Sequence, residues 1–514
     1  MASSAFKISP AQGLSIVIAA LILGSAAMVA AWADGFALAP ADWQALRFTL
    51  LQAGLSAAVS SLLAIPVARA LFRRRFPLRG LLIRLLAAPF VLPVVVAVMG
   101  LLTVFGRGGP INVGLGWLGL PEVSIFGLHG VVLANVFFNL PLATRMLLHG
   151  WQAIPSERFR LAQSLGLPPS TQFRHLEAPM LRAQLPGIFA VILLICLASF
   201  AIALMLGGGP KASTLELAIY QSLRFEFDLG RAALLAAVQF SLCAVITLLA
   251  AKLTLPQGFG AGLGRSMDSP APKSWRRLCD VVAIAAAALF LFGPLLAVVI
   301  KGVPGLAALP NGVWPAVLRS VVVAVVSALL ASAAALIMAT GAARNKGKAI
   351  ELAAMLPLAA SALVLGTGLF LLVRPWIAPE SVALPITVLV NATLTLPYLF
   401  RLLLPEARQL RADYGRLTAS LGLPRRTRLR FVTLPRLARP LGYGAGLAAA
   451  LSMGDLGVIA LFAGDGGATL PLFVQHLIGA YRLQQAAAAS LILVAVSFAL
   501  FWAFDRLGSY YADA

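Results

Sequence analysis

The sequence Ser164-Leu165-Gly166-Leu167-Pro168 recurs 256 residues later as Ser420-Leu421-Gly422-Leu423-Pro424. The same spacing relates Leu140-Pro141-Leu142-Ala143-Thr144-Arg145 to Leu396-Pro397-Tyr398-Leu399-Phe400-Arg401. Two single residues on either side of the pentapeptide also keep this spacing, namely Arg160 with Arg416 and Pro179 with Pro435. Residues 140–179 therefore align with residues 396–435 without a gap. Self-similarity at a fixed spacing is the signature of an internal duplication.

The residues around the repeat have the composition of a membrane protein. Of the 514 residues, 60% are hydrophobic and only 11% are charged, and the mean hydropathy is +0.93. A soluble fold of this length could not bury so much apolar surface. A helix needs about 20 apolar residues to cross a bilayer, and the sequence offers about twelve such stretches. These predicted spans lie near residues 12–32, 48–72, 79–105, 129–150, 184–206, 231–251, 279–301, 313–340, 349–373, 384–404, 441–463 and 486–505.

The basic residues behind the net charge of +22 are distributed according to the predicted topology of the spans. With the N-terminus in the cytoplasm, about 31 of the 40 Lys and Arg fall in cytoplasmic segments or at cytoplasmic helix ends, as the positive-inside rule requires. A nucleic-acid-binding protein would instead need a soluble basic domain with aromatic stacking platforms, and none interrupts the spans. We therefore predict a multi-pass protein of the bacterial inner membrane with both termini in the cytoplasm and no nucleic-acid partner.

The duplication divides the predicted all-α fold into two six-span halves. These are residues 1–252 and 279–514, joined by a cytoplasmic linker at 253–278 that is rich in Gly, Pro, Ser and basic residues. Since six is an even number, the second half enters the membrane in the same orientation as the first. The N-terminal apolar run and Ala31-Trp32-Ala33 imitate a cleaved secretory signal, but the run is longer than a signal core, so we predict a span.

Each half contains a repeated cytoplasmic loop, at 154–179 and 410–435, patterned as a short helix, a glycine break and a second helix. In the first copy Pro155 and Ser156 favour a helix start, and Gly166 favours a helix end. A helix here places Leu161 and Leu165 on one face. The pattern predicts a docking element.

The repeated loops resemble the EAA loop of binding-protein-dependent ABC importer permeases. The resemblance rests on two equally spaced series, Arg160, Gly166 and Pro179 in one half and Arg416, Gly422 and Pro435 in the other. It implies two fused type I (MetI-like) permease repeats, with coupling helices at 154–167 and 410–423 that contact a cytoplasmic ATPase. The leading Glu of the family motif is replaced by arginine in both copies. The coupling residues that the resemblance implies are Arg160, Ala162, Ser164, Leu165, Gly166, Pro179, Arg416, Ser420, Leu421, Gly422 and Pro435.

The resemblance also implies the partners, which are a homodimeric ABC ATPase and a periplasmic substrate-binding protein. The sequence contains no GxxxxGK[ST] motif, so ATP and magnesium would be bound by the ATPase and not by this chain. The four His and three Cys residues are scattered without the spacing of a metal site or of a nucleophile. We predict a transport subunit with no catalytic residue, no metal and no cofactor of its own.

Three further stretches narrow the resemblance to thiamine and thiamine pyrophosphate permeases: 136–143, 206–210 and 454–462. Ferric iron, polyamine and oxyanion permeases share the EAA loop and remain alternatives. An ion-coupled secondary transporter would also have twelve spans and repeats, but it would not need the repeated docking loop.

Four residues are candidates for the substrate path. Asp455 lies inside a predicted span, where a carboxylate is costly unless it meets water, a cation or a partner. It could face a cationic substrate, cap a broken helix or pair with a basic residue. Its counterpart in the first half is Ser199. Phe227 and Tyr481 occupy equivalent positions at the outer ends of the sixth and twelfth spans, as interfacial anchors or as stacking partners for a substrate ring.

Overall fold

A computed structural model describes residues 9–33, 37–86, 92–209, 212–250, 274–345, 347–464 and 467–513, and within these ranges the chain is helical without any strand. Within these described ranges, eleven helices are long and apolar enough to cross a membrane, or up to twelve if one bent helix pair is counted as a span. The predicted all-α polytopic fold is therefore confirmed. Of the predicted linker only residues 274–278 are described, and they are helical; the rest lies outside the described residues.

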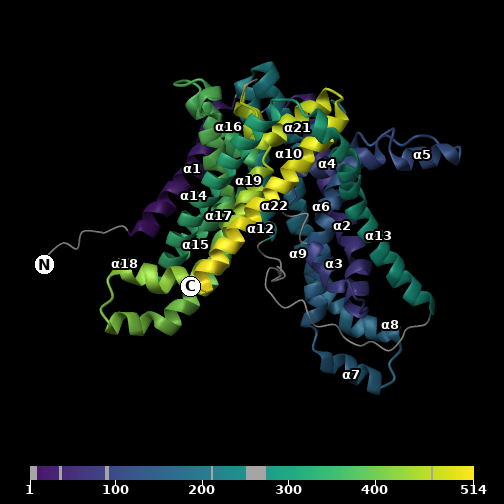
Figure 1. The fold of residues 1–514 in the computed structure, drawn as a ribbon, viewed down its shortest axis with the longest axis horizontal. Helices are drawn as coiled ribbons and strands as arrows, with labels where there is room; N and C mark the ends of the chain where they lie inside the picture. The colour runs from purple at the N-terminus through teal and green to yellow at the C-terminus, as the bar shows by residue number, and fades with distance from the viewer. Residues whose placement is uncertain are drawn as a thin grey trace.

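The helices of the two halves follow one another in matching order (Figure 1). The first half contains α1 (Pro10–Trp32), α2 (Pro40–Arg73), α3 (Arg79–Leu85), α4 (Val94–Phe105), α5 (Pro110–Trp117), α6 (Leu128–Ala153), α7 (Ser156–Ser164), α8 (Pro169–Gln172), η2 (Phe173–Glu177), α9 (Ala178–Leu197), α10 (Phe200–Leu206), α11 (Leu215–Gln221), η4 (Ser222–Glu226) and α12 (Leu229–Ala250). The second half contains α13 (Ser274–Gly305), η5 (Leu306–Ala308), α14 (Val313–Asn345), α15 (Lys348–Met355), η6 (Leu356–Ala359), α16 (Ala362–Val373), η7 (Pro379–Val382), α17 (Ala383–Ser420), α18 (Arg425–Arg428), η8 (Leu429–Thr433), α19 (Leu434–Met453), α20 (Gly457–Phe462), α21 (Leu470–Gly479) and α22 (Leu483–Asp513).

The duplication extends to fine details of the backbone. The π-helical turns η2 and η8 begin 256 residues apart, and so do the spanning helices α9 and α19 that follow them. Among the described residues, Phe227 and Tyr481 are the two non-glycine residues with positive φ, at 55° and 58°. Because such conformations are uncommon outside glycine, their recurrence at matched positions indicates that both halves keep the same local geometry.

The first helix of each half packs on the other half. Helix α1 contacts α14 and α16, whereas α13 contacts α2 and α4. Glycines allow both crossings: a Cβ at Gly368 would lie 2.5 Å from the Ser25 carbonyl oxygen, and one at Gly100 would lie 2.6 Å from that of Pro294. The two repeats therefore interlock across their boundary, while the division of the chain at 252 and 279 stays a prediction from the sequence.

Four predicted spans contain a break between two helices. The stretch at 79–105 is divided between α3 and α4, and that at 349–373 contains two helices that meet at 94°. The stretches at 184–206 and 441–463 break between α9 and α10 and between α19 and α20. Hydropathy counts apolar residues and does not detect the prolines, glycines and side-chain caps that end a helix.

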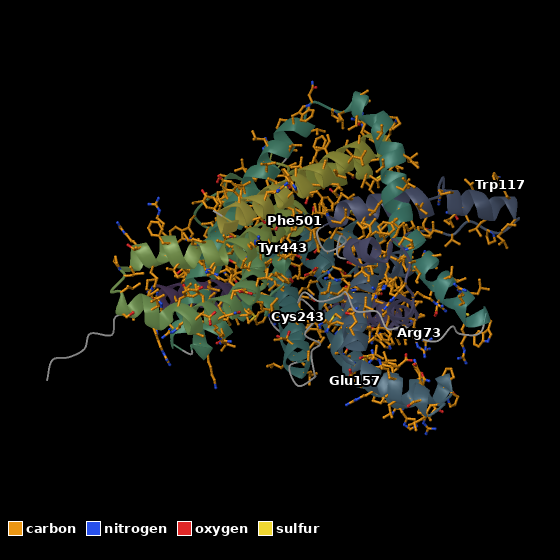
Figure 2. The ribbon with its side chains drawn as sticks, turned by 60° about the horizontal axis from the view of Figure 1, so that its bottom comes forward. Arg73, Trp117, Glu157, Cys243, Tyr443 and Phe501 are labelled. Atoms are coloured by element: carbon orange, nitrogen blue, oxygen red, sulfur yellow. The ribbon has the colours of Figure 1, made fainter. Side chains whose placement is uncertain are left out.

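The helix α5 projects sideways from the bundle. Trp117 lies at its tip, away from the other helices, and is 87% exposed (Figure 2). The second half has only the short turn η7 between α16 and α17, where the first half has α5 between α4 and α6. The halves therefore differ in the connection that follows α4 and α16.

Candidate coupling surfaces and translocation path

The two predicted coupling helices are built differently. In the first half α7 is a separate helix, because Ile154 is extended (φ −71°, ψ 122°) and Pro155 follows it. In the second half α17 continues from the membrane span to Ser420 without interruption. The prediction of a separate short helix at 410–423 was wrong, since Arg411 occupies the position of Pro155 and does not stop the helix.

Both coupling helices end in the same way. Gly166 and Gly422 have φ of 63° and 58°, in the left-handed region. The residue after each glycine donates its backbone N–H to the carbonyl five residues earlier, at 3.0 Å in the first half and 3.3 Å in the second. A Cβ at either glycine would meet nothing within 4 Å. The backbone conformation alone therefore favours glycine here.

Each coupling helix exposes a pair of leucines. Leu161 and Leu165 are 60% and 65% exposed, and Leu417 and Leu421 are 52% and 63% exposed. Ala162 and its counterpart Thr418, which lie between the two leucines in the sequence, are buried. Exposed leucine pairs outside the spans are typical of a surface that a partner protein covers. The two pairs lie at equivalent positions of the repeat.

The remaining predicted coupling residues lie around these leucines. The Ser164 and Ser420 hydroxyls each donate to the backbone carbonyl three residues earlier, at 2.9 Å. Arg160 and Arg416 are exposed next to the leucines. The prolines Pro179 and Pro435 stand in the first turns of α9 and α19. The structure thus places the serines, arginines and leucines on one small surface in each half and the prolines beside the membrane.

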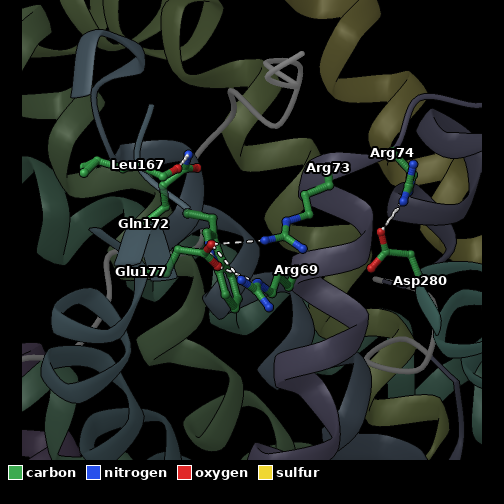
Figure 3. Close-up of polar contacts among 8 residues, drawn as sticks. Arg69, Arg73, Arg74, Leu167, Gln172, Glu177 and Asp280 are labelled. Carbon is green, nitrogen blue, oxygen red and sulfur yellow. Dashed lines mark hydrogen bonds and ion pairs between the residues drawn. The ribbon is translucent and has the colours of Figure 1, made fainter. Parts of the chain in front are cut away.

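A buried carboxylate fastens the first-half loop to the bundle (Figure 3). Glu177, at the end of η2, accepts hydrogen bonds from Arg69 Nε at 2.6 Å and Nη2 at 2.9 Å. Arg73 Nη2 lies 3.3 Å from the same carboxylate, and Trp151 Nε1 donates to it at 3.1 Å. The Arg69 guanidinium also lies 4.6 Å from the centre of the Phe173 ring. Helices α2 and α6 are thus joined to the loop through one side chain.

The second half lacks this carboxylate. The residue at the position of Glu177 is Thr433, and its hydroxyl donates to the Arg428 carbonyl at 3.2 Å. Sequence reasoning missed Glu177, although a signal was present: it is the one acidic residue between Glu157 and Glu216. The charged anchor is therefore a property of the first half alone.

Polar side chains surround the break between α9 and α10. Gln52 Nε2 donates to the Cys196 carbonyl at 2.8 Å, and Asn135 Nδ2 donates to Gln52 Oε1 at 2.9 Å. The Ser199 hydroxyl also donates to the Cys196 carbonyl, at 2.8 Å, and Gln239 Nε2 donates to the Leu197 carbonyl at 2.9 Å. Side chains from α2 and α12 thus satisfy carbonyls that the broken helix leaves free.

Asp455 lies at the matching break between α19 and α20. Its Oδ1 atom lies near the start of α20, 3.9 Å from the position of a Cβ on Gly457. Its Oδ2 atom is buried without a hydrogen-bond partner, and among the described residues it forms no ion pair. The three alternatives for Asp455 stay predictions, and its Oδ2 atom is available for a further contact.

A second buried carboxylate, Glu216 at the start of α11, was missed from the sequence. Glu216 is 2% exposed, and its helix α11 packs against α16 of the other half. Burial raises the pKa of Glu216 to about 7. The Phe200 ring and Asp455 both lie close to Gly457, since a Cβ at Gly457 would lie 3.8 Å from the Phe200 ring and 3.9 Å from Asp455 Oδ1.

The aromatic candidates lie elsewhere. Phe227 and Tyr481 are 70% and 89% exposed, directly before α12 and α22. The structure brings Ser199 and Asp455 to equivalent helix breaks and leaves these two rings on the surface. Instead, Phe200 packs against Tyr220 next to Glu216, with ring centres 5.3 Å apart.

Comparison with known proteins identifies the family. Over 495 residues the chain is 40% identical to the thiamine transport system permease protein ThiP of Escherichia coli K12, which covers 93% of this chain and 90% of the relative. The chain belongs to the thiamine transport system permease family. A second family member, ThiP of Brucella abortus, is 38% identical over 515 residues, covering 96% of this chain and 94% of its own length. No protein-family model matches the sequence.

A more distant relative matches only part of the chain. The molybdenum transport system permease protein ModB of Azotobacter vinelandii is 31% identical over 181 residues, which is 35% of this chain and 78% of that protein. The match places the thiamine permease family within a wider class of ABC permeases. The relatives are named as transport permeases and not as enzymes, so the predicted resemblance and class are confirmed.

Proposed function

We propose that this chain forms the translocation path for thiamine or thiamine pyrophosphate in an ATP-driven importer. A periplasmic binding protein delivers the substrate, and a separate homodimeric ATPase binds ATP and magnesium. The observation that carries this proposal is the pair of exposed leucine surfaces at equivalent positions, on a chain that aligns along almost its whole length with thiamine transport permeases.

The ATPase subunits would contact the leucine surfaces and move them when ATP binds. When the two ATPase subunits close, they would move α7 and the end of α17 towards each other. In the first half the Glu177 anchor passes this movement to α2 and α6 through its hydrogen bonds with Arg69 and Trp151. In the second half the continuous helix α17 passes it directly into the membrane. Movement of both coupling helices would open the path to one side at a time.

The orientation of the chain agrees with this mechanism. Helix α1 begins and α22 ends at the end of the bundle where α7 and α18 lie (Figure 1). Arginine is also abundant in the segments beside these coupling elements. Both features support cytoplasmic termini in the inner membrane.

The two buried carboxylates would meet the cationic part of the substrate. Thiamine carries a permanent positive charge on its thiazolium ring, and a cation next to Asp455 and Glu216 would compensate charges that lack a basic partner among the described residues. The neighbouring Phe200 and Tyr220 rings offer faces on which a heteroaromatic ring can stack. Both halves contribute to this site.

The test is reconstitution of the chain in liposomes with its ATPase and binding protein. Radiolabelled thiamine should accumulate only when ATP is present on the side of the ATPase. Excess ferric iron, polyamine, sulfate or molybdate should not compete. Uptake driven by an ion gradient without any ATPase would refute the importer proposal, and competition by one of the other substrates would refute the thiamine assignment.

A further inference from the structure

We infer that a pocket beside the first-half coupling loop binds the phosphate group of an anionic phospholipid. The pocket has a volume of about 320 Å³ and lies between α2, the loop segment α8 to η2, and the start of α13. It is distinct from the leucine surfaces and from the helix breaks described above. Its principal polar and aromatic lining residues are Arg69, Arg73, Ser170, Phe173, Trp275 and Arg276.

The pocket carries more positive than negative charge. Arg69 and Arg73 share the single carboxylate of Glu177, and Arg74 pairs with Asp280 at 2.7 Å. Arg276 lies over the Trp275 ring at 5.2 Å, and no ion pair of Arg276 is found within the described part of the chain. Three guanidinium groups and one carboxylate, that of Asp280, thus line the pocket, and the Ser170 hydroxyl adds a further donor. Phosphate oxygens are the acceptors that arginine binds most strongly.

The surroundings of the pocket favour a lipid over a soluble phosphate. Two of its walls, α2 and α13, are membrane-spanning helices, so the pocket lies at the depth of the lipid headgroups. The α13 surface that continues from it into the membrane is apolar and exposed, with Leu278, Val281 and Val282 at 64%, 53% and 56%. Acyl chains can therefore cover this surface while the headgroup occupies the pocket. Basic pockets between spanning helices on the cytoplasmic side are typical sites for anionic headgroups.

Lipid binding itself does not depend on the transported substrate. An effect of the lipid on the coupling loop, however, rests on the proposed function. Arg69 and Arg73 line the pocket and also hold Glu177, so a bound phosphate would share the arginines that fasten the loop to α2. The helix α1, which corresponds to α13, begins with Pro10-Ala11-Gln12 and has no arginine at this point. The lipid site would therefore act on one coupling loop only.

Labelling of Cys279 tests the inference on the full-length chain. Cys279 lines the pocket and is exposed, whereas Cys196 and Cys243 are buried. The maleimide labelling rate is measured in phosphatidylcholine vesicles with and without 20% phosphatidylglycerol. We expect phosphatidylglycerol to slow labelling of the wild type. In Arg276→Gln the protection should weaken about fivefold, the factor expected for one arginine near an anionic lipid surface.

Two controls separate the pocket from general surface effects. Arg506→Gln removes an arginine that lies over Trp502 at 5.8 Å but lines no described pocket, and it should keep the protection. A cysteine at exposed Leu507, in a Cys279→Ser background, reports the general effect of vesicle charge on labelling. Equal slowing at positions 279 and 507, or unchanged protection in Arg276→Gln, would overturn the inference. Protection by inorganic phosphate alone would assign the pocket to a soluble phosphate instead of a lipid.

Discussion

Replacement of Glu177 by glutamine should disconnect the first coupling loop from α2. Glutamine keeps the size of the side chain but removes the charge that Arg69 and Arg73 share. Only 4% of the Glu177 side chain is exposed, so water cannot replace the lost interaction. The Trp151 N–H would keep an acceptor, while the two guanidinium groups would be left beside each other.

The size of the effect follows from burial. Removal of one partner of a buried ion pair costs about 3–5 kcal/mol. Because Arg69 and Arg73 are 26% and 19% exposed, solvent screening reduces this to about 2–3 kcal/mol. If this free energy favours the docked loop over the undocked loop, the substitution lowers the equilibrium constant for docking about 30-fold or more. We therefore expect a lower unfolding midpoint in sodium dodecyl sulfate and fewer thiamine molecules transported per ATP hydrolysed.

The matched control is Glu351→Gln. Glu351 pairs with Arg408 at 2.5 Å, but the two side chains are 33% and 52% exposed. Exposed pairs contribute about 0–1 kcal/mol, so this variant should resemble the wild type in both assays. Equal behaviour of Glu177→Gln and Glu351→Gln would refute the idea that the buried anchor joins the loop to the bundle.

Three further predictions concern glycines and a titrating group. Gly166→Ala and Gly422→Ala place a Cβ in the left-handed region at about 1–2 kcal/mol each, so both should weaken ATPase co-purification while the chain stays in the membrane; normal co-purification of both would contradict the docking role. Gly368→Ala brings a Cβ within 2.5 Å of the Ser25 carbonyl and should destabilise the chain by about 1–3 kcal/mol in the same detergent titration, whereas Gly24→Ala, where a Cβ meets nothing within 4 Å, should not. Since the pKa of Glu216 is raised to about 7, its carboxyl is neutral below pH 7 and gains its charge above it, so uptake of cationic thiamine should rise from pH 6 to pH 8; Glu216→Gln should abolish this rise, and an unchanged pH profile would exclude Glu216 from the path.

The local features of the coupling loops could be predicted because they depend on neighbouring residues. Gly166 ends its helix as expected, and Leu161 and Leu165 lie together on an exposed face. The error at 410–423 has the same origin, since the absence of a proline at Arg411 lets α17 continue. In each case the residues within one or two helical turns determine where the helix begins and ends.

Contacts between distant segments could not be predicted in this way. Arg69 and Glu177 are separated by 108 residues, and neither residue by itself indicates the other. Glu216 is buried and its helix α11 packs on α16 only because the halves pack together, and the sequence of this short helix gives no sign of burial. Similarly, the pocket beside Arg276 exists only where α13 reaches the first half.

The sequence by itself determined the membrane environment, the duplication, the family and the sites where the coupling helices end. These properties depend on composition and on short-range pattern, which a linear chain already contains. The tertiary structure decided which half carries the charged anchor, that α1 and α13 each pack on the opposite half, and that Glu216 is buried. Those properties depend on burial and on the loss of water around charges, and both arise only when distant segments pack against one another.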